Sequence, residues 1–237
     1  MTHAMSLTRE RWMALFFATG SACFLIGPFP GYEALVGTTV VAITFFVGSV
    51  LFTVGGALQV GLALPDPASS ERGGEALWAA AVQSAGTIFF NVSTFHGLQT
   101  APAQATYDKL VWRPDAFGSI CFLASGLIAY RASARHGWRP ARDQPGWWEP
   151  SINLLGCIFF GISAVAGHVV PSSGSIVDLA AANWNTGLGA ACFLACALAT
   201  LRTGRTSKSP RLRRLRAIEH AIERDVETIE RDVGWTG

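Results

Sequence analysis

The chain has 237 residues, of which 50% are hydrophobic and 14% are charged, whereas an ordinary soluble domain carries about 25% charged residues. Nearly half of the charged residues follow position 200, so too few remain before it to cover a water-soluble core of that size. Composition therefore excludes a soluble globular enzyme and predicts a protein that lies in a lipid bilayer.

Six apolar stretches are candidates for membrane-spanning helices, because a bilayer core about 30 Å thick needs roughly 20 apolar residues. The helices are expected near 12–29, 38–63, 76–98, 115–131, 149–170 and 182–201. The fourth is short, so Arg131 has to extend toward the membrane surface. We predict an all-α fold, with a transmembrane bundle over 1–203 and a cytoplasmic segment over 204–237.

Turn signals and tryptophans mark the ends of these stretches. The segments PFPGYE, LPDPASSERGG and RPARDQPG separate successive helices. Tryptophans are typical of the membrane surface, and six of them fall where predicted helices end. They are Trp12, Trp78, Trp112, Trp147, Trp148 and Trp184.

The basic residues predict the orientation, because Lys and Arg are enriched on the cytoplasmic side of membrane proteins. With six spans, 16 of the 18 basic residues fall on the side of the two termini, and only Lys109 and Arg113 fall on the other. We therefore expect a multi-pass protein of the cell membrane with both termini in the cytoplasm.

Every predicted helix carries the same short motif, which reads glycine, small, any, any, phenylalanine, any, any, small, small. The six copies are GSACFLIGP, GSVLFTVGG, GTIFFNVST, GSICFLASG, GCIFFGISA and GAACFLACA. Their glycines and phenylalanines are Gly20 and Phe24, Gly48 and Phe52, Gly86 and Phe90, Gly118 and Phe122, Gly156 and Phe160, and Gly189 and Phe193. Pro28 is the one departure, at the last position of the first copy.

The motif predicts a packing seam, since its first, fifth and eighth positions share one helix face and small residues let helices approach closely in membranes. The alternative is a substrate pathway lined by glycines. When successive helices are taken in pairs, the first residues of the two motif copies in a pair are 28, 32 and 33 residues apart. The chain therefore reads as three tandem helical hairpins, related as parallel repeats about an axis along the membrane normal.

These helices resemble those of the small YrhK-type two-helix membrane domains. The segment LVWRPDAFGSICFLASGLIAY over 110–130 also resembles a set of uncharacterised multi-pass bacterial membrane proteins. The resemblance covers about 20 residues closely and the remainder only through the repeat. It implies a membrane location and no particular activity.

Three uncharged polar residues lie within the predicted spans, where polar groups are costly and informative. They are Gln83, Asn91 and Asn153. Hydrogen bonds between helices explain them at about 0.6 kcal/mol each. The alternative is that they line the path of a transported solute.

Two histidines near the outer helix ends, His96 and His168, are the candidates for a metal or haem site. Each is followed by a loop aspartate, Asp108 or Asp178, and two imidazoles can ligate one metal or haem iron. The histidines lie 10 and 12 residues after their motif glycines, so they are not equivalent in the repeat. We interpret them as interfacial histidines and expect neither metal nor cofactor.

The tail after residue 201 predicts an amphipathic helix over 210–237. Apolar residues recur there at a mean spacing of 3.6, beginning at Leu215. Basic residues in its first turn suit an anionic membrane surface, whereas the acidic remainder favours contact with protein. We expect a second copy of the chain or a cytoplasmic protein as its partner, and no nucleic acid. The alternative is a solvated helix that packs against its own bundle.

Motifs of hydrolases and of nucleotide-dependent enzymes do not occur in the sequence. The first hypothesis is therefore a non-enzymatic membrane protein that acts as a scaffold, sensor or accessory subunit. The second is a small-solute transporter or channel. The third is a haem- or metal-binding redox protein.

Overall fold

The computed structural model of the chain describes residues 2–64, 74–101, 106–134, 138–140, 142, 146–170, 173 and 175–206. Contacts divide the chain into two units, Met1–Leu201 and Arg202–Gly237. The arrangement given below is that of the first unit. The amphipathic helix predicted over 210–237 lies outside the described residues.

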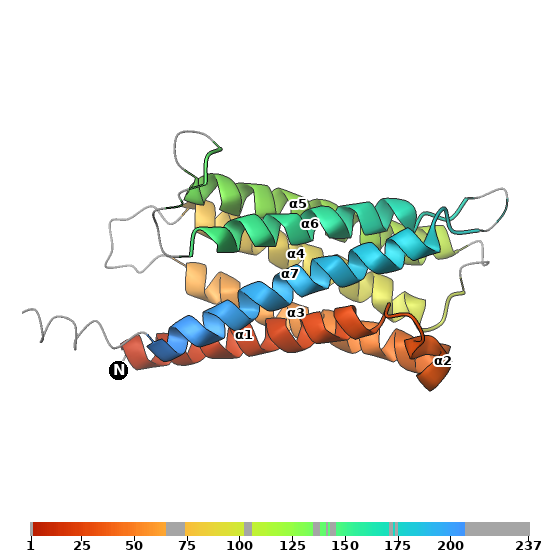
Figure 1. Cartoon of the computed structure of the whole chain (residues 1–237), viewed down its shortest axis with the longest axis horizontal. Helices are drawn as coiled ribbons and strands as arrows, with labels where there is room; N and C mark the ends of the chain where they lie inside the picture. Colours follow the sequence, from red (N-terminus) through yellow and green to blue (C-terminus); the bar gives the residue numbers. More distant parts are fainter. Residues whose placement is uncertain are drawn as a thin grey trace, which may run out of the picture. The chain divides into compact units, whose positions relative to one another are not determined.

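The described residues are helical apart from turns and isolated bridging residues, such as the pair Val169 and Ile176, which confirms the all-α class. The elements in chain order are α1 (Thr2–Ile26), α2 (Tyr32–Val36), α3 (Thr38–Ala63), α4 (Gly74–Gly97), the π-helical turn η1 (Asp108–Trp112), α5 (Arg113–Ser133), α6 (Trp148–Ala166) and α7 (Leu179–Thr206). The six long helices lie side by side (Figure 1). Each overlaps one of the six predicted helices.

Several helix ends differ from the predicted ones for local reasons. The first helix begins at Thr2 rather than 12 and ends at Ile26, before Pro28. The short helix α2 follows between Gly31 and Gly37, whose φ angles of 88° and 83° suit glycine. The fifth helix ends at Ala166 rather than 170, because the backbone beyond it pairs with residues 175–178. The fourth gains length at its start, where η1 precedes α5.

Four helices are long and apolar enough to span a membrane, which indicates a membrane protein. They cover Thr38–Ala63, Asp108–Ser133, Trp148–Ala166 and Leu179–Arg202. The remaining long helices carry more polar residues. In α1 these lie near its start, at Arg9, Glu10 and Arg11, and α4 has Gln83 and Asn91 within it.

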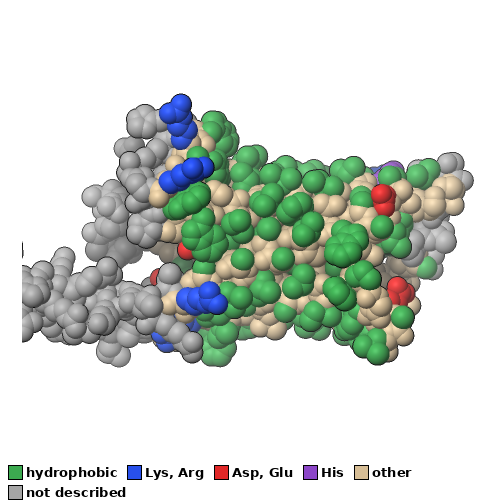
Figure 2. Space-filling view, in the orientation of Figure 1, with side chains coloured by type: hydrophobic (Ala, Val, Ile, Leu, Met, Phe, Trp, Pro, Cys, Tyr) green, Lys and Arg blue, Asp and Glu red, His purple; other side chains and the backbone are tan. Residues whose placement is uncertain are grey.

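The described surface is apolar around the middle of the bundle, whereas small polar side chains lie inside. Ile120 and Val165 are 61% and 71% exposed, while Ser21, Ser49 and Thr87 are fully buried. Figure 2 shows hydrophobic side chains over the middle of the bundle and Lys and Arg side chains gathered at one end. Such a distribution suits contact with lipid, because helices in membranes associate through small residues rather than through bulky apolar ones.

The motif glycines lie at the crossings of three helix pairs, α1 with α3, α4 with α5 and α6 with α7. A Cβ atom built on Gly20 would lie 3.0 Å from the carbonyl oxygen of Gly48. The same distance to the partner's carbonyl oxygen is 3.0 Å for Gly86 and 3.2 Å for Gly156. The helices of each pair are therefore as close as backbone atoms allow, and a side chain larger than hydrogen does not fit without a shift.

The motif phenylalanines form the buried core, as two triangles of rings. The rings of Phe24, Phe90 and Phe160, from α1, α4 and α6, have centroids 5.8–6.5 Å apart. The rings of Phe52, Phe122 and Phe193, from α3, α5 and α7, have centroids 5.7–6.3 Å apart. Within each helix pair the two rings lie 5.0–5.7 Å apart, so the triangles stack. We call this core the phenylalanine cluster.

Candidate functional site

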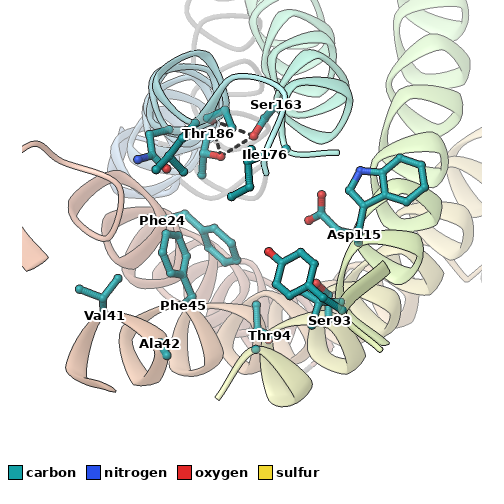
Figure 3. Close-up of a pocket in the computed structure, with 18 of the residues that line it drawn as sticks. Phe24, Val41, Ala42, Phe45, Ser93, Thr94, Asp115, Ser163, Ile176 and Thr186 are labelled. Atoms are coloured by element: carbon teal, nitrogen blue, oxygen red, sulfur yellow. Dashed lines mark hydrogen bonds between the residues drawn. The ribbon is translucent and has the colours of Figure 1, made fainter. Parts of the chain in front are cut away.

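Two cavities flank the phenylalanine cluster along the bundle. The far cavity lies toward the end that holds α2, and the near cavity lies toward the end where α1 begins. The far cavity has a volume of about 300 Å³ and is lined from all six long helices and from η1. Small-molecule sites have volumes of about 300–1,000 Å³, so the far cavity is the candidate site (Figure 3).

Most polar groups in the wall of the far cavity are already paired within the protein. Ser163 donates to the Ala182 carbonyl oxygen at 2.8 Å, and its hydroxyl lies 2.7 Å from that of Thr186. Thr94 donates to the Phe90 carbonyl oxygen at 2.7 Å. The Ser163 bonds join α6 to α7, the Thr94 bond lies within α4, and all these hydroxyls are largely occupied before any ligand arrives.

The Asp115 carboxylate is the charged group of the far cavity. It comes from the first turn of α5, and in Figure 3 it points into the cavity from the side opposite Phe24 and Phe45. Within the described part of the chain, no hydrogen bond or ion pair engages this carboxylate. Burial of a carboxylate without a partner is costly in free energy, which makes Asp115 the candidate functional residue of this cavity.

Tyr107 and Asn183 contribute two further polar side chains to the same cavity. Burial raises the pKa of the Tyr107 phenol above its ordinary value, and the nearby Asp115 carboxyl adds to the increase. The phenol therefore stays neutral at physiological pH and keeps its O–H as a donor.

Five aromatic side chains line the far cavity, namely Phe24, Phe45, Tyr107, Trp112 and Phe160. The Trp112 indole N–H donates to the Ala164 carbonyl oxygen at 2.8 Å, which fixes the indole ring between α5 and α6. Trp112 therefore faces the interior, whereas Trp12, Trp78 and Trp184 are 54–67% exposed. Trp78 and Trp184 lie in the second turn of α4 and of α7, as expected of residues at the membrane surface, but Trp12 lies in the middle of α1.

The near cavity is smaller, at about 120 Å³, and is lined by amide side chains. It contains Gln83 and Asn153, two of the predicted intramembrane polar residues, together with Gln59. The side-chain carbonyl oxygen of Gln59 is buried without a hydrogen-bond partner. Asn91 lines neither cavity and instead donates to the Thr53 hydroxyl at 2.6 Å, across α3 and α4.

The phenylalanine cluster separates the two cavities. The gap among its rings is about 10 Å³, and a water molecule needs at least that volume together with polar partners. Phe24 and Phe160 form the floor of the far cavity, and Phe52 and Phe193 form that of the near one. The bundle therefore has a closed apolar barrier at its centre.

The structure does not bring the two predicted histidines into a shared site. The His168 ring packs on Trp112 with centroids 4.4 Å apart, and the His96 ring packs on Phe95 at 5.6 Å. Asp108 pairs with Arg113 at 2.9 Å, and Asp178 accepts the Ala181 backbone N–H at the start of α7. Among the residues that the structure describes, no three His, Cys, Asp or Glu side chains are placed to hold a metal ion.

Sequence reasoning missed Asp115, Tyr107 and Gln59 as lining residues. Asp115 follows Pro114, so it reads as the start of a helix near the membrane surface, and Tyr107 precedes the fourth predicted helix. The sequence does contain one signal for Asp115: it is the charged residue nearest to the motif glycine Gly118, three residues before it.

Comparison of the chain with protein-family models, with curated proteins and with solved structures finds no match.

Proposed function

We propose that the chain crosses the membrane six times as three tandem hairpins, α1 with α3, α4 with α5 and α6 with α7. The proposal is supported by the glycine crossing within each pair and by the two triangles of phenylalanine rings, to which each pair contributes one ring per triangle. The six motif glycines and phenylalanines act as the packing seam. The resemblance to YrhK-type two-helix domains is consistent with a hairpin as the repeating unit.

The near end of the bundle is proposed to face the cytoplasm in the cell membrane. Among the described residues, Arg9 and Arg11 in the first half of α1 and Arg131 at the end of α5 lie on this side, whereas Lys109 and Arg113 lie on the other. A reporter enzyme that works only in the cytoplasm should be active when it is fused after Gly237. A reporter that works only after export should be inactive at the same position, and its activity would contradict the orientation.

The function that the geometry supports best is ligand binding in the far cavity, so that the protein acts as a non-enzymatic sensor or accessory subunit. The observation that carries this proposal is a cavity of about 300 Å³ into which the unpaired Asp115 carboxylate points. A packing scaffold alone does not account for such a carboxylate, because its burial without a partner is unfavourable.

Filling the far cavity tests this function. Ala42 lines it from α3, whereas Ala57 of the same helix is exposed. We expect a panel of neutral, anionic and cationic small molecules to contain one class that raises the melting temperature of the purified protein in detergent. Ala42→Phe should abolish the response and Ala57→Phe should retain it. Equal responses of both variants would contradict binding in this cavity.

A second candidate function is solute transport, because polar cavities lie on both sides of the phenylalanine cluster. The near cavity offers amides from three helices, at Gln59, Gln83 and Asn153. The described conformation is closed, so transport requires the cluster to open. Measurement of solute flux into liposomes distinguishes a transporter from a sensor, because a sensor binds its ligand without flux.

A further inference from the structure

The wall of the far cavity is selective for charge. Its lining contains the Asp115 carboxylate and, among the residues described, no Lys, Arg or His side chain. The nearby Arg113 does not compensate this charge, since its guanidinium donates to Asp108 at 2.9 Å. When Asp115 is ionised, the cavity therefore carries a net negative charge, which favours a bound cation and disfavours an anion.

The aromatic lining narrows the kind of cation. The rings of Phe24 and Phe45 meet edge to face at 5.5 Å, and those of Phe24 and Phe160 at 5.9 Å. Aromatic faces attract alkylated ammonium groups through the ring quadrupole and through apolar contact with the methyl groups. A small metal ion instead needs several oxygen ligands, and the hydroxyls of Thr94, Ser163 and Thr186 are engaged in hydrogen bonds to the protein.

The volume of the far cavity limits the size of the cation that it can hold. About 300 Å³ lies at the lower limit of small-molecule sites, so the cavity suits a compact cation rather than an extended one. Tyr107 and Asn183 add a hydroxyl and an amide that are able to bind a polar substituent on such a cation.

We propose that the far cavity binds a small alkylated ammonium cation, with the Asp115 carboxylate as its counter-charge and the aromatic side chains packed around its alkyl groups. This proposal rests on the ligand-binding function given above and names the class of ligand. The same chemistry is present in a free compound such as choline and in the headgroup of phosphatidylcholine, because the far end lies near a membrane surface.

The test uses the full-length protein, purified in a maltoside detergent, and measures binding by calorimetry and by thermal stability. The probes are choline chloride and 3,3-dimethylbutan-1-ol, which has the same shape without the charge. Short-chain phosphatidylcholine, with phosphatidylglycerol of the same chain length as its control, tests the lipid source. The test variant is Asp115→Asn. The control variant is Asp178→Asn, which also removes one carboxylate but should keep the start of α7 intact, because asparagine caps a helix as aspartate does.

Choline is expected to bind the wild type and Asp178→Asn equally, and Asp115→Asn at least tenfold more weakly. The neutral alcohol should bind the wild type at least tenfold more weakly than choline. A response to phosphatidylcholine that exceeds the response to free choline assigns the headgroup as the ligand. Equal binding of choline and the alcohol would overturn the cation proposal and leave ligand binding intact. A wild type that binds none of these probes would also overturn the cation proposal, and a further lack of response to the whole panel of small molecules described above would overturn ligand binding as well.

Discussion

The tightest glycine crossing lies between α6 and α7, and one substitution there tests the packing seam. A Cβ atom built on Gly189 would lie 2.5 Å from Cδ2 of Phe160 and 3.0 Å from the carbonyl oxygen of Gly156. The Phe160 ring cannot swing away freely, because it stacks on Phe193 at 5.5 Å and lies 5.9 Å from Phe24. In Gly189→Ala the helices must therefore move apart.

The control lies two residues earlier in the same helix. A Cβ atom on Gly187 would lie 4.0 Å from side-chain atoms of Leu25 and Pro28, which is ordinary contact. Both variants gain the same helix propensity, up to about 1 kcal/mol for alanine over glycine. Overpacking costs about 1–3 kcal/mol, so Gly189→Ala should be less stable than Gly187→Ala by about that amount. A difference of about 2 kcal/mol changes the folding equilibrium roughly 30-fold.

The assay is unfolding of the purified variants in mixed micelles with increasing sodium dodecyl sulfate, followed by circular dichroism. A repeat of the comparison in α6 uses Gly156→Ala, whose Cβ atom would lie 3.0 Å from Cβ of Cys192, against Gly161→Ala, which meets no atom within 4 Å. Equal stability within both pairs of variants would refute the argument that the motif glycines are needed for close approach.

Three further predictions concern the core, a hydrogen bond between helices and the tail. Phe122→Ala should lower the free energy of unfolding by about 3–5 kcal/mol, because the Phe122 ring is 2% exposed in the phenylalanine cluster. Phe117→Ala in the same helix should change it little, since Phe117 is 54% exposed. Equal losses of stability in the two variants would contradict the phenylalanine cluster as the core. Asn91→Leu, which removes the hydrogen bond to Thr53, should cost about 0.6 kcal/mol, and a loss of several kcal/mol would show that more than this bond is broken. Removal of 210–237 should reduce the number of chains in the detergent-solubilised particle, as measured from its mass. An unchanged number of chains would exclude self-association through the tail.

The helices could be predicted because each depends on a local property of the sequence. An apolar run that ends in charges or in Pro and Gly indicates where a helix ends. The predicted limits are wrong at the end of α6, where the backbone beyond the run pairs with itself. They are also wrong at the start of α1, which continues through the charged residues 9–11 to Thr2. The spacing of the motif placed Gly156 and Phe160 on one helix face, and in the structure both are buried at the contact with α7.

The far cavity could not be predicted, because it depends on which helices meet. Asp115 lies at a predicted helix start in the sequence, and only the arrangement of the six long helices makes that position part of a cavity wall. Gln83 and Asn153 were singled out from polarity alone, but their meeting with Gln59 in the near cavity follows from packing. Local patterns therefore indicate which residues are unusual, and tertiary contacts decide what these residues face.

The two triangles of the phenylalanine cluster have a consequence for how such a bundle is assembled. Each helix pair supplies one ring to each triangle, so a single pair leaves both triangles incomplete and exposes its ring edges to lipid. Three separate two-helix chains would present the same six rings as this one chain does. If the three pairs are hairpin repeats, as proposed above, the chain corresponds to a trimer of hairpins joined end to end, and its core forms at a fixed local concentration instead of depending on how much protein the membrane holds.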